Sequence, residues 1–187
     1  MNKKLSIIIG VVVVAAVAIG YFASRGSNDN SITEKDVTTG ETTYTNLDYG
    51  FSIVYGNKWD GPAEMKGENS KGMDPYVNAI FRSTSTLETV VIAGKPGDKE
   101  SFNEAAAALD MPYLVVTVGG LPALKYEYVS AINEEATLFA KTVIFIFKGL
   151  KNGSLTMAYQ ALFDDEAKAK AADLSRLNEF LTHVRFN

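Results

Sequence analysis

The chain has 187 residues, room for one ordinary domain and an appendage, and 47% of them are hydrophobic, which excludes global disorder. It contains no cysteine and a single histidine, His183, so disulfides, thiolate metal sites, cysteine nucleophiles and sites with several imidazoles from one chain are excluded. The net charge at pH 7 is −4, and no acidic residue precedes Asp29. The rest of the chain is acidic without a basic stripe, so we expect no nucleic acid as a partner.

Residues 1–23 are predicted to be a membrane anchor. Lys3 and Lys4 precede the uncharged run 5–22, which as a helix is about 27 Å long, close to the roughly 30 Å hydrocarbon core of a bilayer. A cleaved signal peptide, which would leave the protein secreted, is the alternative, but its small residues at 16–18 lie inside the apolar run. We favour an uncleaved anchor that contacts the lipid bilayer through residues 5–22. The basic flank places the N-terminus in the cytoplasm and the following domain outside the cytoplasmic membrane.

The polar segment 24–41 is predicted to be a flexible linker, and 42–187 the extracytoplasmic domain. The domain opens with a strand at 51–55, preceded by a short strand near 43–44. Residues 56–76, with four glycines and two prolines, are expected to form a long loop.

The middle of the domain predicts a strand pair, one helix and the first of two hairpins. Residues 78–82 and 88–93 form the strand pair, joined by a Ser/Thr turn. Ser101 and Glu104 have the spacing of a capping box, which predicts a helix that begins there and ends before Pro112. Gly119-Gly120 between two β-rich runs favours the hairpin.

The second hairpin has its turn at Lys151-Asn152-Gly153. Residues 143–147 are apolar on both faces, which predicts a central strand covered on both sides. A closing helix capped by Asp164, and a short terminal strand, complete an α+β domain with a mostly antiparallel sheet. The apolar stripe of the closing helix comprises Ala167, Ala171, Leu174, Leu177, Leu181 and Val184.

Three segments resemble the PsbP/Mog1-like superfamily. Residues 49–59, YGFSIVYGNKW, resemble its opening strand and Trp-containing loop, although the family commonly has Pro where Gly56 stands. Residues 118–128, VGGLPALKYEY, are similar to its glycine-led hairpin, and residues 162–187 look like its last strand, helix and terminal Phe. The resemblance implies an αβα sandwich, an antiparallel sheet flanked by helices.

The superfamily's members mostly bind and scaffold other proteins, and many bacterial members are membrane-tethered. One branch of the superfamily binds a small GTPase, and nothing in the chain selects the photosynthetic branch. Kinship of fold does not transfer a function. The resemblance therefore implies a protein-binding role with an unspecified partner.

Catalytic chemistry has weak candidates in this sequence. The carboxylates at 164–166 suit helix capping better than acid/base work. His183 and Glu179 have i, i+4 spacing, which is typical of a surface pair near a helix end. We expect no catalytic residue, no cofactor and no metal.

Two sets of binding residues are predicted around the first strand. Phe51 and Tyr55 alternate into the core, whereas Tyr49 and Trp59 flank the strand and are the better candidates for exposure and binding, with burial in the core as the favoured alternative for Trp59. The following loop is rich in the oxygen ligands that calcium prefers, although no EF-hand spacing is present. Its candidate residues are Asp60, Glu64, Glu68 and Asp74.

These observations favour a non-enzymatic protein-binding or scaffolding module of the cell envelope, anchored in the membrane, with an envelope protein as partner. One alternative is a small-molecule or cation-binding module that uses residues 60–74. The other is an envelope hydrolase with a carboxylate mechanism, which needs a polar cleft that the sequence does not show.

Overall fold

The computed structural model describes residues 31–36, 38–63, 76–133 and 135–187. The predicted anchor, residues 1–23, lies outside these ranges. Within them, no helix combines the length and the hydropathy that crossing a membrane requires.

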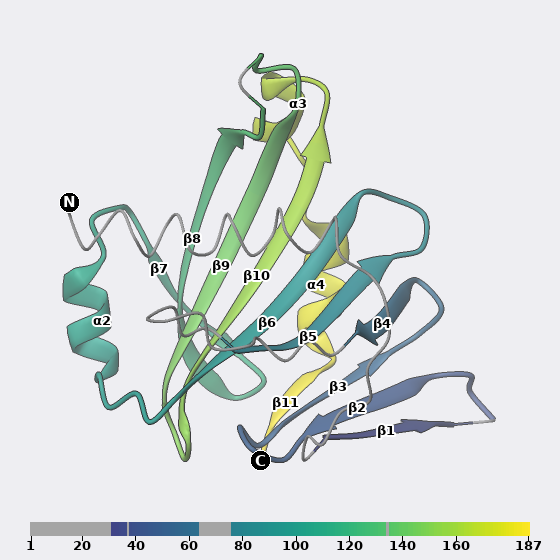
Figure 1. The fold of residues 1–187 in the computed structure, drawn as a ribbon, viewed down its shortest axis with the longest axis vertical. Helices are drawn as coiled ribbons and strands as arrows, with labels where there is room; N and C mark the ends of the chain where they lie inside the picture. The colour runs from purple at the N-terminus through teal and green to yellow at the C-terminus, as the bar shows by residue number, and fades with distance from the viewer. Residues whose placement is uncertain (1–30, 37, 64–75, 134) are drawn as a thin grey trace.

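The strands form two antiparallel sheets (Figure 1). The small sheet has the order β1-β2-β3-β11, with β1 Ser31–Lys35, β2 Thr42–Asn46, β3 Phe51–Tyr55 and β11 Val184–Phe186. The large sheet has the order β4-β5-β6-β10-β9-β8-β7, with β4 Trp59–Ala63, β5 Tyr76–Ser83, β6 Glu88–Pro96, β7 Leu114–Val118, β8 Leu121–Ala131, β9 Phe139–Leu150 and β10 Gly153–Phe163.

Three described helices accompany the sheets: α2 Phe102–Ala108, α3 Glu166–Lys170 and α4 Ser175–Thr182. In Figure 1 the long strands of the large sheet stand between α2 on one side and α4 with the small sheet on the other. The α+β class and the antiparallel pairing are confirmed. One face of the large sheet, however, is shared by a helix and a second sheet, because β11 returns to pair with β3.

The main core lies between the two sheets and α4. It joins fully buried aromatic rings of the small sheet, Tyr44 and Phe51, to Phe81 and Phe147 of the large sheet and Phe180 of α4. Tyr44 and Phe81 meet edge to face with their ring centres 6.1 Å apart. Rings in this geometry stabilise a core beyond the area that they bury.

Several local predictions are confirmed. The strand at 51–55 has the predicted bounds, with alternate residues buried. Ser101 caps α2, with the Ser101 and Glu104 side chains each bonding the other's backbone amide. Both hairpins form, and residues 143–147 belong to β9, which lies between β8 and β10.

Four predictions are corrected. Ser31–Lys35, placed in the linker, forms β1, a polar strand held by pairing with β2 rather than by burial. Trp59–Ala63, placed in the loop, forms β4 against β5. The single closing helix is two helices, α3 and α4, which are separated by the turn at 171–174. In that turn Asp173 accepts a hydrogen bond from the Ser175 amide at 2.9 Å. Asp165, not Asp164, caps α3.

Candidate functional site

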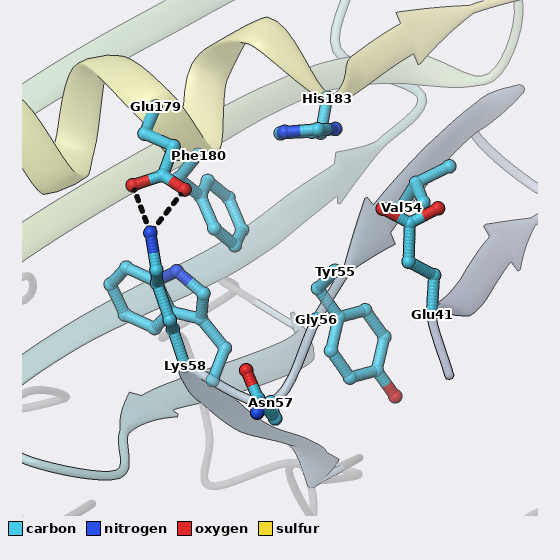
Figure 2. A pocket seen from close by; sticks show the side chains of 10 residues that line it. Glu41, Val54, Tyr55, Gly56, Asn57, Lys58, Glu179, Phe180 and His183 are labelled. Carbon is cyan, nitrogen blue, oxygen red and sulfur yellow. Dashed lines mark hydrogen bonds and ion pairs between the residues drawn. The ribbon is translucent and has the colours of Figure 1, made fainter. Parts of the chain in front are cut away.

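A groove lies where the turn between β3 and β4 meets α4 (Figure 2). Its volume is about 120 Å³, well below the roughly 300 Å³ at which drug-sized ligand pockets begin. The groove can accept one side chain of another molecule. Its lining residues are Glu41, Val54, Tyr55, Gly56, Asn57, Lys58, Trp59, Glu179, Phe180 and His183.

Trp59 is one of the residues that line the groove. Its indole packs edge to face on Phe180 of α4, with ring centres 5.1 Å apart, and Trp59 is only 8% exposed. The backbone amide of Trp59 donates to the Gly56 carbonyl at 3.2 Å, which closes the preceding turn. Of the two alternatives for Trp59, the structure has the core one and not the exposed one: α4, which is remote in sequence, covers the ring.

An ion pair crosses the rim of the groove. The Lys58 ammonium donates to both carboxylate oxygens of Glu179, at 2.6 and 2.9 Å, as the dashed lines in Figure 2 show. This hydrogen bond lowers the pKa of Glu179. Glu179 is thus held by Lys58 rather than by His183, its expected partner. Pairs this exposed contribute little to stability, so the ion pair mainly fixes the shape of the rim.

Hydroxyl groups and a guanidinium continue the surface beside the groove. The turn at 84–87 lies against the turn at 57–58, because the Thr84 amide donates to the Lys58 carbonyl at 3.0 Å. Arg176 of α4 donates to Ser85 Oγ and Thr86 Oγ1 in this turn, each at 3.0 Å, and to Ser83 Oγ at the end of β5 at 2.7 Å. Leu87, the last residue of the turn, is 70% exposed. We call this continuous surface, comprising residues 57–58, 84–87, Arg176 and Glu179, the α4 rim.

Tyr49 is also buried, contrary to expectation. Its residue is 6% exposed, and its ring lies over Gly94 of β6, where a Cβ would approach the ring atoms to 2.1 Å. The Tyr49 amide donates to Asn46 Oδ1 at 3.0 Å. Only a glycine at position 94 of β6 leaves room for this ring. Tyr49 and Gly94 are so far apart in sequence that no local pattern predicts their contact.

The acidic candidates are only partly within the described ranges. Asp60 lies on β4 and is exposed, opposite Arg82 of β5. Glu64, Glu68 and Asp74 lie outside the described residues, so the cation site stays a prediction. In the ranges that the structure describes, no three His, Asp or Glu side chains converge as metal ligands would.

The carboxylates at 164–166 have structural partners. Asp165 accepts the Lys168 amide at 2.9 Å as the cap of α3. Asp164 accepts the Lys168 ammonium at 2.8 Å, and Glu166 pairs with Lys170. The capping interpretation of this cluster is confirmed, with the cap moved by one residue.

A more deeply buried polar cluster joins the end of β6 to the hairpin of β9 and β10. Asp98 accepts hydrogen bonds from Lys148 at 2.7 Å and from Ser154 Oγ at 2.6 Å, and the two charged side chains are each 6% exposed. Burial opposes the charge of Asp98, but these bonds and the Glu100 amide outweigh it and hold the pKa well below its usual range. The cluster anchors a loop and opens into no described groove.

No protein-family model and no curated protein matches this chain. Among solved structures, it is similar to a Bacteroides thetaiotaomicron protein determined at 1.50 Å, with a TM-score of 0.52 and 13% identity over 78% of this chain and 48% of that one. This chain thus spans about half the length of that protein, and the likeness shows a shared fold only. It is also similar to the cyanobacterial PsbP protein CyanoP of Synechocystis sp. PCC 6803, with a TM-score of 0.43 and 12% identity over 91% and 99% of the two chains. That second likeness is too weak to place this chain in a family.

Proposed function

We propose that the chain is a non-enzymatic protein-binding module of the cell envelope, with a PsbP/Mog1-like fold, tethered to the cytoplasmic membrane through residues 5–22. The α4 rim is the surface that receives an envelope protein. The observation that carries the proposal is this rim: an exposed leucine and an arginine beside an aromatic-floored groove too small for an ordinary ligand.

The composition of the α4 rim suits a protein partner. Leu87 exposes 70% of its surface, and the guanidinium of Arg176, paired with Glu88 at 3.4 Å, lies beside it. Arginine is enriched among the residues that dominate protein interfaces. The hydroxyls of Ser85 and Thr86, which already bond Arg176, supply a polar border around the leucine.

The hydrogen bonds within the rim reduce the cost of binding. Arg176 is held by Ser83, Ser85 and Thr86, and Lys58 by Glu179, so these long side chains lose little freedom when a partner docks. Immobilising one such side chain otherwise costs about 0.5–1.5 kcal/mol. A preformed polar border of this kind supports specific contact with another protein.

The test is photo-cross-linking in native membranes. A photoreactive amino acid replaces Leu87 in one variant and Lys151, at the exposed tip of the hairpin between β9 and β10, in a matched control. We expect one reproducible adduct with another envelope protein from position 87 and none from position 151. The adduct should disappear when Arg176→Glu is added, with folding checked by circular dichroism. Equal labelling from both positions would refute the proposal.

A further inference from the structure

The edges of the two sheets differ in their protection against pairing with another strand. β1 carries Glu34 and Lys35, and β4 carries Asp60, Pro62 and a register shift against β5. Charges, prolines and irregular pairing are the usual means of blocking an exposed edge. These two edges are therefore guarded.

The third edge, β11, is guarded by its length and its neighbours. It has three residues, including Arg185, and the Phe186 amide donates to the carbonyl of Gly119 at 3.4 Å. Gly119 lies so close that a Cβ there would be 2.9 Å from the Val184 carbonyl oxygen. This edge therefore abuts the turn between β7 and β8.

Among the residues that the structure describes, the β7 edge has none of these devices. Residues 113–117 read Tyr-Leu-Val-Val-Thr, without a charge, a proline or a glycine, and β8 is the only described strand that pairs with β7. Tyr113, Leu114 and Val115 are 40%, 64% and 61% exposed. Uncharged, β-rich segments of this kind pair readily with further strands.

The direction of the free backbone groups follows from the hairpin. Val118 and Leu121 close a two-residue turn, so they form a hydrogen-bonded pair, and alternate residues along β7 do the same with β8. Val116 and Leu114 thus use their amides and carbonyls inside the sheet. The backbone groups of Val115 and Thr117 point outward along the open edge.

We propose that this edge pairs antiparallel with the β7 edge of a second copy of the chain, about a two-fold axis at Val115, so that the two large sheets become one. Val115 then exchanges both backbone hydrogen bonds with Val115 of the other copy, and Thr117 lies opposite position 113. Leu114 lies opposite Val116 of the other copy, and both side chains are on the face of the sheet that Val115 does not share.

A second copy satisfies this edge because the segment is complementary to itself. The two-fold arrangement places uncharged side chains opposite one another at every position from 113 to 117, so no like charges meet. The arrangement is also closed: the described part of each copy offers one such edge and uses it once, which gives a dimer rather than a fibre. This dimer leaves the α4 rim free, because the rim is formed by the turn between β3 and β4, the turn between β5 and β6, and α4.

The absence of native cysteine makes the register directly testable. Two residues in a hydrogen-bonded antiparallel pair have Cα atoms about 5.5 Å apart, within disulfide range. Oxidation of full-length Val115→Cys in detergent should give a species at twice the 20.3 kDa monomer mass. Thr117→Cys alone should give none, since its two copies are about 13 Å apart along the strands. Tyr113→Cys with Thr117→Cys should restore the doubled species.

Mass measurement by light scattering gives a second readout without cysteine. Val115→Lys should halve the mass of the wild-type dimer, whereas the β-branched control Val115→Thr should leave it unchanged. A monomeric wild-type chain, or a doubled species from Thr117→Cys alone, would overturn the proposal. So would a Val115→Cys adduct in native membranes with a different protein, which would assign the edge to that protein's strand. Cross-linking at Leu87 tests the proposed function separately.

Discussion

Replacing Gly94 by alanine should expel the Tyr49 ring from its place on β6. A Cβ at position 94 would meet the end of that ring at 2.1–2.4 Å, which no real contact permits. The ring must leave a site where its residue is 6% exposed. Losing the burial of one large side chain costs about 2 kcal/mol.

The coupling between the two positions gives a sharper expectation than either change alone. Tyr49→Ala should cost about 3 kcal/mol through lost packing. In Gly94→Ala/Tyr49→Ala the new methyl group enters space that the ring has left, so the double variant should also cost about 3 kcal/mol rather than the additive value of about 5.

The assay is urea unfolding of the full-length chain in mild detergent. Trp59 is the sole tryptophan and is buried against Phe180, so its fluorescence follows the loss of the core. Leu87→Ala, at an exposed position, serves as the matched control and should change the free energy of unfolding little. Additive costs, or a harmless Gly94→Ala, would show that Tyr49 does not pack as described and would return it to the binding candidates.

Three further predictions concern charge. Hydrogen bonds lower the pKa of Asp98 in the folded state, so the contribution of Asp98 to stability is complete above about pH 4 and is lost as the pH falls below that value. Asp98→Asn should therefore flatten the acid side of a stability-versus-pH curve. An unchanged curve would contradict the buried pair of Asp98 and Lys148. Lys148→Met leaves that carboxylate buried without its cation and should cost about 3 kcal/mol in urea unfolding, whereas Lys58→Met should cost less than about 1 kcal/mol because its pair with Glu179 is exposed; equal costs would refute this ranking. Calorimetry with millimolar calcium should show no heat, and a saturable heat lost in Asp60→Asn would favour the cation-binding alternative.

Local chemistry made much of the fold predictable. The capping box of α2, the Gly119-Gly120 turn and the alternation of β3 each depend on residues that are close in sequence. The break between α3 and α4 was missed because the apolar spacing continues through it, while α4 begins without a side-chain cap that the sequence could signal. Periodicity therefore identified the helical region without its interruption.

The candidate site was less predictable because it depends on distant pairs. The burial of Trp59 requires Phe180, and that of Tyr49 requires Gly94. No spacing rule connects such positions, and an aromatic residue beside a glycine-rich loop has the same local pattern whether a helix covers it or not. The ion pair between Lys58 and Glu179 is likewise visible only in the folded geometry.

The pairing of β3 with β11 also has a consequence for the order of folding. It joins the strand at 51–55 to the strand at 184–186, two of the most widely separated segments of the described chain. Contacts between distant segments form late because a long loop must close first. When the chain is synthesised from its N-terminus, β3 can therefore pair with β2 early, while its other edge stays unpaired. The small sheet is complete only after the other described strands have been synthesised, because β11 is the last of them.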